Sequence, residues 1–201
     1  MMILRSAPAS PFGRKVKIAA SLLSLSNQIE IVAADTAKPD EKLLAQNPLG
    51  KIPVLELSDG TTLFDSRVIV EYLDSLSPGQ TVFPAGMARF AALRLAALAD
   101  GIMEAALLLV YEKRLRPESA WNAVWMENQT GKIARALTVL SADPPAAPEA
   151  PMIGEIGLAC ALGYLDLRHQ GVWRTEFPAL VPWLDRFAAA VPAFEATRVK
   201  T

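Results

Sequence analysis

The chain has 201 residues, of which 52% are hydrophobic and 20% are charged, and its 20 basic and 21 acidic side chains give a formal charge of −1. This composition excludes intrinsic disorder, and the balanced charge excludes the basic surface of a nucleic-acid-binding protein. No stretch approaches the ~20 apolar residues that a membrane helix needs. One cysteine and one histidine allow no internal disulfide and disfavour a metal site or Ser-His-Asp catalysis. We therefore expect a cytoplasmic protein that uses no metal, membrane or nucleic acid.

The first 77 residues alternate between strand and helix patterns. Short apolar runs predict four strands, over residues 2–5, 28–33, 52–57 and 61–64. Apolar residues at helical spacing predict helices over 11–25 and from Asp65-Ser66 onward, with a short helix or turn over 39–45. The segment Ser58-Asp59-Gly60 predicts a hairpin turn between the last two strands. The resulting order, β-α-β-α-β-β-α, indicates a small α/β layer.

The composition changes after the break at Ser77-Pro78-Gly79. The rest of the chain is rich in Ala and Leu, and no segment has a convincing strand pattern. Helical patterns cover residues 86–114, 118–141, 154–169 and 178–190. The sequence therefore predicts two domains: an α/β domain over residues 1–77 and an all-helical bundle over residues 85–201.

Five motifs resemble those of one known family. They are residues 10–16 (SPFGRKV), 47–55 (NPLGKIPVL), 64–73 (FDSRVIVEYL), 161–166 (ALGYLD) and 178–187 (PALVPWLDRF). In this order they closely resemble the cytosolic glutathione transferases, the bacterial members in particular, over nearly the whole chain. The resemblance implies a thioredoxin-like first domain that binds glutathione, a helical second domain that contributes an electrophile pocket, and a homodimer.

Ser10 is the candidate catalytic residue. It stands before Pro11 at a predicted helix start, as an N-cap serine does. A ligand thiol placed there would meet a hydroxyl donor and the positive end of a helix, and both stabilise the nucleophilic thiolate. An N-cap serine without a ligand, or Ser6 as the residue that contacts the thiol, are the alternatives. Because some relatives carry cysteine at this position, serine argues against thiol-disulfide chemistry.

Three further segments are candidates for glutathione binding. The resemblance implies a cis bond between Ile52 and Pro53, which would leave the Ile52 backbone to pair with an extended peptide; a trans proline at a strand start is the alternative. Asp65 and Ser66, at a helix N-terminus, suit the ammonium and carboxylate of a γ-glutamyl group, and capping of their own helix is compatible with this role. Lys38 either pairs with the glycyl carboxylate or is a solvated loop lysine.

The electrophile pocket is harder to predict. The family pattern implicates Phe12 and three residues of the first helix in the second domain: Met103, Leu107 and Tyr111. Apolar residues at helical spacing usually belong to the core, and this is the alternative for all of them. One departure from the family is Met152, which stands where a Ser or Thr usually caps the buried helix; only Glu155 remains of that capping box.

These residues together predict a glutathione transferase that activates the thiol of glutathione for attack on an apolar, electrophilic small molecule, in a detoxification role. Two alternatives stay open. One is a non-enzymatic relative that acts as an interaction or regulatory protein, because a fold does not settle function. The other is a glutathione-dependent isomerase, dehalogenase or ether-cleaving enzyme, which would use the same thiolate. The sequence does not identify the electrophile.

Overall fold

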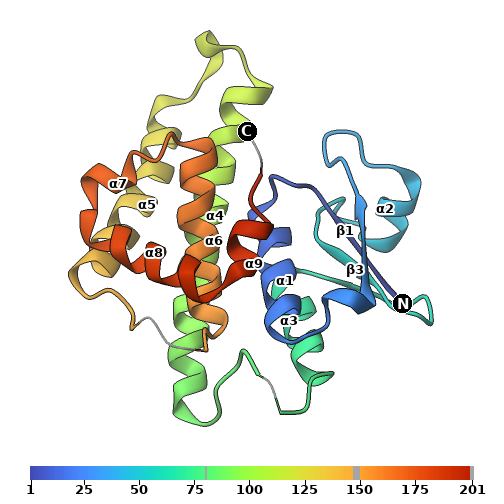
Figure 1. Cartoon of the computed structure of the whole chain (residues 1–201). Helices are drawn as coiled ribbons and strands as arrows, with labels where there is room; N and C mark the ends of the chain where they lie inside the picture. Colours follow the sequence, from blue (N-terminus) through green and yellow to red (C-terminus); the bar gives the residue numbers. More distant parts are fainter. Residues whose placement is uncertain (80, 147–149, 200–201) are drawn as a thin grey trace. The chain divides into compact units, whose positions relative to one another are not determined.

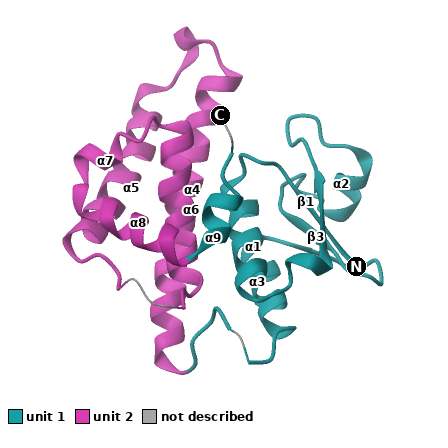
Figure 2. Cartoon of the chain, in the orientation of Figure 1, with its two compact units in different colours: residues 1–85, 191–201 teal, residues 86–190 magenta. Residues whose placement is uncertain are grey.

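The structure is a computed structural model that describes residues 1–79, 81–146 and 150–199 (Figure 1). Residues 80, 147–149 and 200–201 lie outside the described part, and the last five of these belong to the expected helical domain. The chain forms two compact units, Met1–Ala85 with Val191–Thr201, and Gly86–Ala190 (Figure 2). The sequence assigned all of 85–201 to one domain, whereas the chain beyond Ala190 belongs with the first unit.

The first unit has the predicted β-α-β-α-β-β-α order. Its elements are β1 (Met2–Ser6), α1 (Pro11–Leu22), η1 (Ser26–Gln28), β2 (Ile29–Ala33), α2 (Glu41–Gln46), β3 (Val54–Glu56), β4 (Thr62–Phe64), α3 (Ser66–Ser75) and α9 (Pro192–Ala196). The strands form one sheet in the order β2-β1-β3-β4, in which β1 and β2 are parallel and the other pairs antiparallel. The predicted hairpin joins β3 to β4, where Gly60 has a positive φ of 86°.

The core of the first unit lies between the sheet and two helices. Helices α1 and α3 pack against each other, and α2 lies on the opposite side of the strands (Figure 1). The apolar stripe of each helix predicted this burial: Val16 and Ala19 of α1 and Ile69 and Leu73 of α3 are fully buried. This packing fixes the N-terminal ends of α1 and α3, where the candidates Ser10, Asp65 and Ser66 lie.

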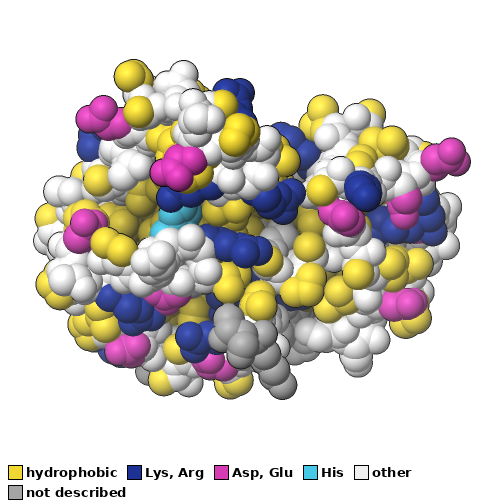
Figure 3. Space-filling model, turned by 90° about the horizontal axis from the view of Figure 1, so that it is seen from above, with side chains coloured by type: hydrophobic (Ala, Val, Ile, Leu, Met, Phe, Trp, Pro, Cys, Tyr) yellow, Lys and Arg dark blue, Asp and Glu magenta, His cyan; other side chains and the backbone are white. Residues whose placement is uncertain are grey.

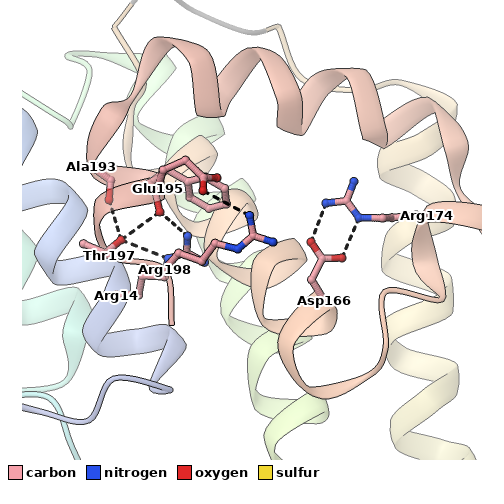
Figure 4. A network of polar contacts seen from close by, with 8 residues as sticks. Arg14, Asp166, Arg174, Ala193, Glu195, Thr197 and Arg198 are labelled. Carbon is pink, nitrogen blue, oxygen red and sulfur yellow. Dashed lines mark hydrogen bonds and ion pairs between the residues drawn. The ribbon is translucent and has the colours of Figure 1, made fainter. Parts of the chain in front are cut away.

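Helix α9 returns to the first unit and is held there by Arg14 of α1. The Arg14 guanidinium donates from Nη2 to the Phe194 carbonyl at 2.5 Å and from Nε to Thr197 Oγ1 at 3.3 Å (Figure 4). Its central carbon also lies 4.0 Å from the centre of the Phe194 ring. Arg14 is thus a structural link between two helices that are 180 residues apart in the sequence.

The described residues of the second unit form helices and the loops that join them, without a strand. It contains α4 (Met87–Leu115), η2 (Glu118–Ala120), α5 (Ala123–Ala142), α6 (Ile153–Arg168), α7 (Trp173–Glu176), η3 (Pro178–Leu180) and α8 (Val181–Ala190). The four predicted helical patterns correspond to α4, α5, α6 and η3 with α8, except that α5 begins at Ala123 and not at residue 118. Helix α7 is an additional single turn. Among the described residues, no helix is both long and apolar enough to span a membrane.

Helices α4 and α6 run side by side in the same direction (Figure 1). Their contacts pair Gly154 with Ala92, Gly157 with Ala99, and His169 with Ala106. A Cβ atom at Gly154 would lie 2.9 Å from the Ala92 carbonyl oxygen, so glycine is required there for close approach. Because the contacts advance along both helices together, the helices are parallel, and the C-terminal end of α6 lies beside Ala106, nine residues before α4 ends at Leu115.

Both ends of α6 are fastened by carboxylates. At the start, the Glu155 carboxylate accepts from the Met152 backbone N–H at 3.1 Å, which is the half of the capping box that the sequence predicted. At the end, Asp166 accepts from Trp173 Nε1 at 2.8 Å and from Arg174 at 2.9 and 2.7 Å (Figure 4). These bonds hold the turn from α6 into α7.

Candidate functional site

The strand register brings four chain segments to one edge of the sheet. Arg5 of β1 lies opposite Val54 of β3, and Val54 lies opposite Phe64 of β4. Ser6 of β1 lies opposite Ala33 of the parallel strand β2. The C-terminal ends of β1, β2 and β4 therefore meet the N-terminal end of β3 at the same edge.

The candidate residues of the first unit follow or precede these strand ends. Ser10 comes four residues after β1, Ile52 and Pro53 come directly before β3, and Asp65 and Ser66 come directly after β4. The structure thus places at one sheet edge three segments that are up to 56 residues apart in the sequence. The motifs alone did not establish this arrangement.

Ser10 caps α1 as the sequence predicted. Its side-chain oxygen accepts from the Gly13 backbone N–H at 3.1 Å, and the residue is half-buried at the positive end of the helix. The alternative residue, Ser6, is only 2% exposed, and its hydroxyl lies where a Cβ of Gly13 would stand. Ser10 is therefore the more accessible of the two hydroxyl groups.

The bond between Ile52 and Pro53 is cis, which confirms the geometry that the resemblance implied. The loop before it is held by Asn47, whose side chain donates to the Lys51 carbonyl at 2.9 Å and accepts from the Leu49 N–H at 3.0 Å. The first residue of β3 in the ladder is Val54. Ile52 therefore lies outside the sheet's own strand pairing.

Asp65 caps α3 from an unusual backbone conformation. Its φ is 65°, a left-handed value that a non-glycine residue adopts at an energetic cost of about 1–3 kcal/mol. Its carboxylate accepts from the Arg67 N–H at 2.9 Å, so the predicted capping is present. Because a carboxylate can accept more than one hydrogen bond, Asp65 can cap α3 and still accept from a second donor. Ser66 is the first residue of α3 and is buried, and the first N–H groups of a helix have no intrahelical acceptor.

Lys38 lies in the loop that follows β2, and its side chain is exposed. The neighbouring Pro39 lies 3.9 Å from the position of a Cβ on Gly50. This contact brings the Lys38 loop against the loop that carries Ile52 and Pro53. The lysine is thus near the same sheet edge, in contact with solvent.

The electrophile-pocket candidates differ in exposure. Phe12, Leu107 and Tyr111 are partly exposed, whereas Met103 is fully buried. Met103 therefore presents no surface to a ligand in this structure, because its position on the buried face of α4 makes it a core residue. The core interpretation of apolar residues at helical spacing holds for this position.

The pairing of Tyr111 with Arg114 in α4, and of Tyr164 with Arg168 in α6, was not predicted from the sequence. The Arg114 guanidinium lies 5.4 Å from the centre of the Tyr111 ring. Burial raises the pKa of Tyr164 to about 12, and the nearby Arg114 and Arg168 act in the opposite direction. The spacing of the pairs, i,i+3 and i,i+4, was the available signal, but it does not show that two helices align.

His169 is the C-cap residue of α6. Its Nε2 atom lies 3.1 Å from the Ala106 carbonyl oxygen, and because a carbonyl only accepts, Nε2 carries the proton. Burial lowers the pKa of His169 below 6.5, and the bond to Ala106 opposes this effect. The single histidine reaches the surface seen in Figure 3, where acidic, basic and hydrophobic side chains are interspersed.

A thioredoxin-like α/β unit and an all-helical unit are the two parts of the glutathione transferase fold. Residues 9–76 match the family model of the glutathione S-transferase N-terminal domain, and residues 123–186 match that of the C-terminal domain. The chain belongs to the glutathione S-transferase family.

Solved structures and a curated protein resemble the chain over most of its length. A glutathione transferase family member from Pseudomonas fluorescens Pf-5 with bound glutathione is 41% identical, with a TM-score of 0.94 and 100% of both chains covered. A structure of a family member from the same strain with bound S-(propanoic acid)-glutathione is 40% identical, with a TM-score of 0.88 and the same coverage. The uncharacterized GST-like protein YibF of Escherichia coli K12 is 34% identical over 185 residues, 90% of each chain.

Proposed function

We propose that this protein is a glutathione transferase that binds glutathione at the sheet edge of its first unit and activates the thiol for attack on an electrophilic small molecule. The observation that carries the proposal is the meeting of Ser10, Ile52-Pro53 and Asp65-Ser66 at that edge. The similar structures from Pseudomonas fluorescens support it, because one contains glutathione and the other contains glutathione with a carbon group on sulfur.

In this proposal each polar or charged group of glutathione has a residue of the first unit to bind it. The γ-glutamyl carboxylate would accept from the Ser66 N–H and hydroxyl, and the γ-glutamyl ammonium would donate to Asp65. The backbone of Ile52 would pair with the cysteinyl backbone of the tripeptide, as an added strand does. Lys38 would attract the glycyl carboxylate from its exposed position, with a small contribution because water screens the charge.

In this proposal the Ser10 hydroxyl donates a hydrogen bond to the thiolate sulfur. The thiol proton leaves to solvent, and the sulfur forms a bond with an electrophilic carbon. Either a leaving group departs from that carbon with its electron pair, or a π bond opens and the adjacent carbon takes up a proton. Ser10 stabilises the thiolate and does not have to remove the proton itself.

The experiment is glutathione binding by calorimetry, followed by conjugation assays with a panel of electrophiles. Asp65→Asn keeps the capping oxygen but removes the charge, so we expect the Kd for glutathione to rise about tenfold. The same substitution should have little effect on an analogue of glutathione that lacks the α-amino group. If the wild-type protein binds no glutathione, the proposal is wrong.

The electrophile panel separates the remaining alternatives. Conjugates indicate a transferase, whereas released halide, a cleaved ether or an isomerised substrate without a stable conjugate indicates the other reactions of the same thiolate. A stoichiometric protein partner without glutathione binding would favour the non-enzymatic interaction protein. The presence of a hydroxyl at position 10 favours chemistry on the thiol.

We further propose that the protein is a cytoplasmic homodimer with a detoxification role. Each unit exposes large apolar side chains that a second copy would cover: Phe64, Val68 and Leu76 in the first unit, and Met87 and Phe90 in the second. Light scattering on the purified protein tests the dimer. A monomer mass at micromolar concentration would contradict it.

A further inference from the structure

Arg5 of β1 is a buried cation between the two strands that border the proposed glutathione-binding loops. In the strand register it lies opposite Val32 of β2 and opposite Val54 of β3. The loop with Lys38 follows β2, and the loop with the cis proline precedes β3. Arg5 is only 6% exposed, and a guanidinium stays charged in a protein. The strand thus places a permanent positive charge beneath the beginning of both loops.

The partner of this charge is Asp40, the N-cap residue of α2. Arg5 Nη1 lies 3.8 Å from Asp40 Oδ2, and Asp40 Oδ1 accepts from the Leu43 N–H at 2.6 Å. Each carboxylate oxygen of Asp40 therefore has a partner of its own. Because the Arg5 Nε atom has no hydrogen-bond partner among the described residues, the ion pair with Asp40 is the contact that compensates this guanidinium.

Glu56 is the other acidic residue on this face of the sheet, and it is bound elsewhere. It lies opposite Ile3, two residues before Arg5 on the same strand. Its Oε2 atom accepts from Gln46 Nε2 at 2.6 Å and lies 3.3 Å from Lys42 Nζ. The negative charge of Glu56 is thus compensated from α2, and that of Asp40 is compensated from β1.

Lys38 stands two residues before Asp40 and is not engaged in the same way. Its side chain is exposed, and it forms no hydrogen bond or ion pair with any residue of 1–79, 81–146 and 150–199. Two residues of chain span at most about 7 Å, so an uncompensated Asp40 would attract the lysine ammonium and repel an incoming carboxylate. The charge of Arg5 cancels that of Asp40 and leaves the charge of Lys38 available to a ligand.

We propose that Arg5 is a positioning residue for the glycyl end of glutathione. By neutralising Asp40 it keeps Lys38 free to bind the terminal carboxylate, so the protein selects thiol peptides that end in a free carboxylate. This inference rests on the proposed binding of glutathione and specifies which form of the ligand the site prefers. Arg5 acts through Asp40 and Lys38, because its own side chain is buried.

The experiment measures the binding of glutathione and of its glycyl amide, in which an uncharged amide replaces the terminal carboxylate. Calorimetry at an ionic strength of about 10 mM, where the screening of charges is weak, gives both Kd values. The quantity compared is the selectivity ratio, the Kd of the amide divided by the Kd of glutathione. A substitution that only destabilises the fold weakens the binding of both ligands and leaves this ratio unchanged.

We expect the two members of the ion pair to have opposite effects on the ratio. Arg5→Met should lower it about threefold, because the uncompensated Asp40 then competes with the ligand for Lys38. Asp40→Asn keeps an oxygen that can cap α2 but removes the negative charge, and it should raise the ratio about twofold. The double variant should return to the wild-type ratio, and Lys38→Met should bring the ratio close to one.

Asp59→Asn is the matched control, because it removes an exposed carboxylate from the β3–β4 hairpin at the opposite edge of the sheet. It should leave the ratio unchanged. If Arg5→Met does not fold, Asp40→Asn still decides the question, and a ratio at or below the wild-type value would overturn the inference. If the wild-type protein binds neither peptide, the proposed function fails. If it binds both peptides equally well, the proposed function stands and the selection of the carboxylate is rejected.

Discussion

Ser10 caps α1, and we propose that the same hydroxyl group also binds the thiol of glutathione. Its oxygen accepts from the Gly13 N–H, which caps α1, and its proton is available to a ligand at the helix N-terminus. The sequence predicted both roles from the order Ser-Pro at a helix start. Only burial distinguishes the two candidate hydroxyl groups, because Ser6 turns toward Gly13 and is 2% exposed whereas Ser10 is half-buried.

Ser10→Ala should lower kcat for conjugation about 10- to 100-fold and raise the pKa of the bound thiol, because a hydrogen bond to a charged sulfur is lost. The Kd for glutathione should change less. Thiolate absorbance as a function of pH measures the thiol pKa in the complex. Ser6→Ala is the control: an effect on the thiol pKa larger than that of Ser10→Ala would contradict the assignment.

His169 gives the stability of the protein a specific pH dependence. Burial lowers its pKa in the folded protein below the unfolded value of 6.5. The unfolded state therefore binds more protons in this range. The contribution of His169 to the free energy of unfolding is fully present above pH 6.5, and it is lost as the pH falls from 6.5 toward the folded pKa. We expect His169→Gln, which can still donate to the Ala106 carbonyl, to flatten this part of the profile. Denaturant unfolding of both proteins between about pH 8 and pH 5.5 measures the difference; parallel profiles would exclude His169 as the cause.

At the scale of elements, most helices and strands follow local sequence patterns, whereas the short helices α7 and α9 do not. The periodicity of apolar residues predicted α1, α3 and the four long helical stretches of the second unit. Helices α7 and α9 have four and five residues, which is too short for a periodic signal. They form because Asp166 and Arg14 bind them from helices elsewhere in the same unit.

A substitution at Gly154 would test whether α4 and α6 must pack closely. Gly154→Ala would place a Cβ 2.9 Å from the Ala92 carbonyl oxygen, a backbone atom that yields only if the helices separate. We expect the free energy of unfolding to fall by about 1–3 kcal/mol. Gly101→Ala is the matched control, because Gly101 lies within α4 with open space around it. That substitution should stabilise the protein by about 0.5–1 kcal/mol, and equal losses in both variants would rule out the steric explanation.

At the scale of the whole molecule, the chain leaves the first unit after Ala85 and returns to it at Val191. The return depends on Arg14, which is 9% exposed and joins α1 to the Phe194 carbonyl. The sequence placed residues 191–201 in the helical domain because their composition resembles it. Only the long-range contact shows where they belong.

Arg14→Met keeps the aliphatic part of the side chain but removes its hydrogen bonds. We expect a loss of about 1–3 kcal/mol in the free energy of unfolding, because the Phe194 carbonyl loses a buried, charged donor, and faster amide hydrogen exchange in α9. Arg198→Met is the control, since Arg198 forms an exposed pair with Glu195 at 3.3 Å. Exposed pairs contribute little, so a comparable effect at Arg198 would argue against the role of Arg14.

The sequence by itself determined the local features of this protein: the helix caps, the Asp-Gly hairpin, the order of elements, and the motifs that relate it to the glutathione transferases. These depend on neighbouring residues, because capping, turn formation and amphipathic spacing act over a few positions. The tertiary structure decided what depends on distant pairing. The strand register brought Ser10, Ile52-Pro53 and Asp65-Ser66 to one edge, and core packing buried Met103. Close approach at Gly154 and Gly157 aligned α4 with α6 in parallel.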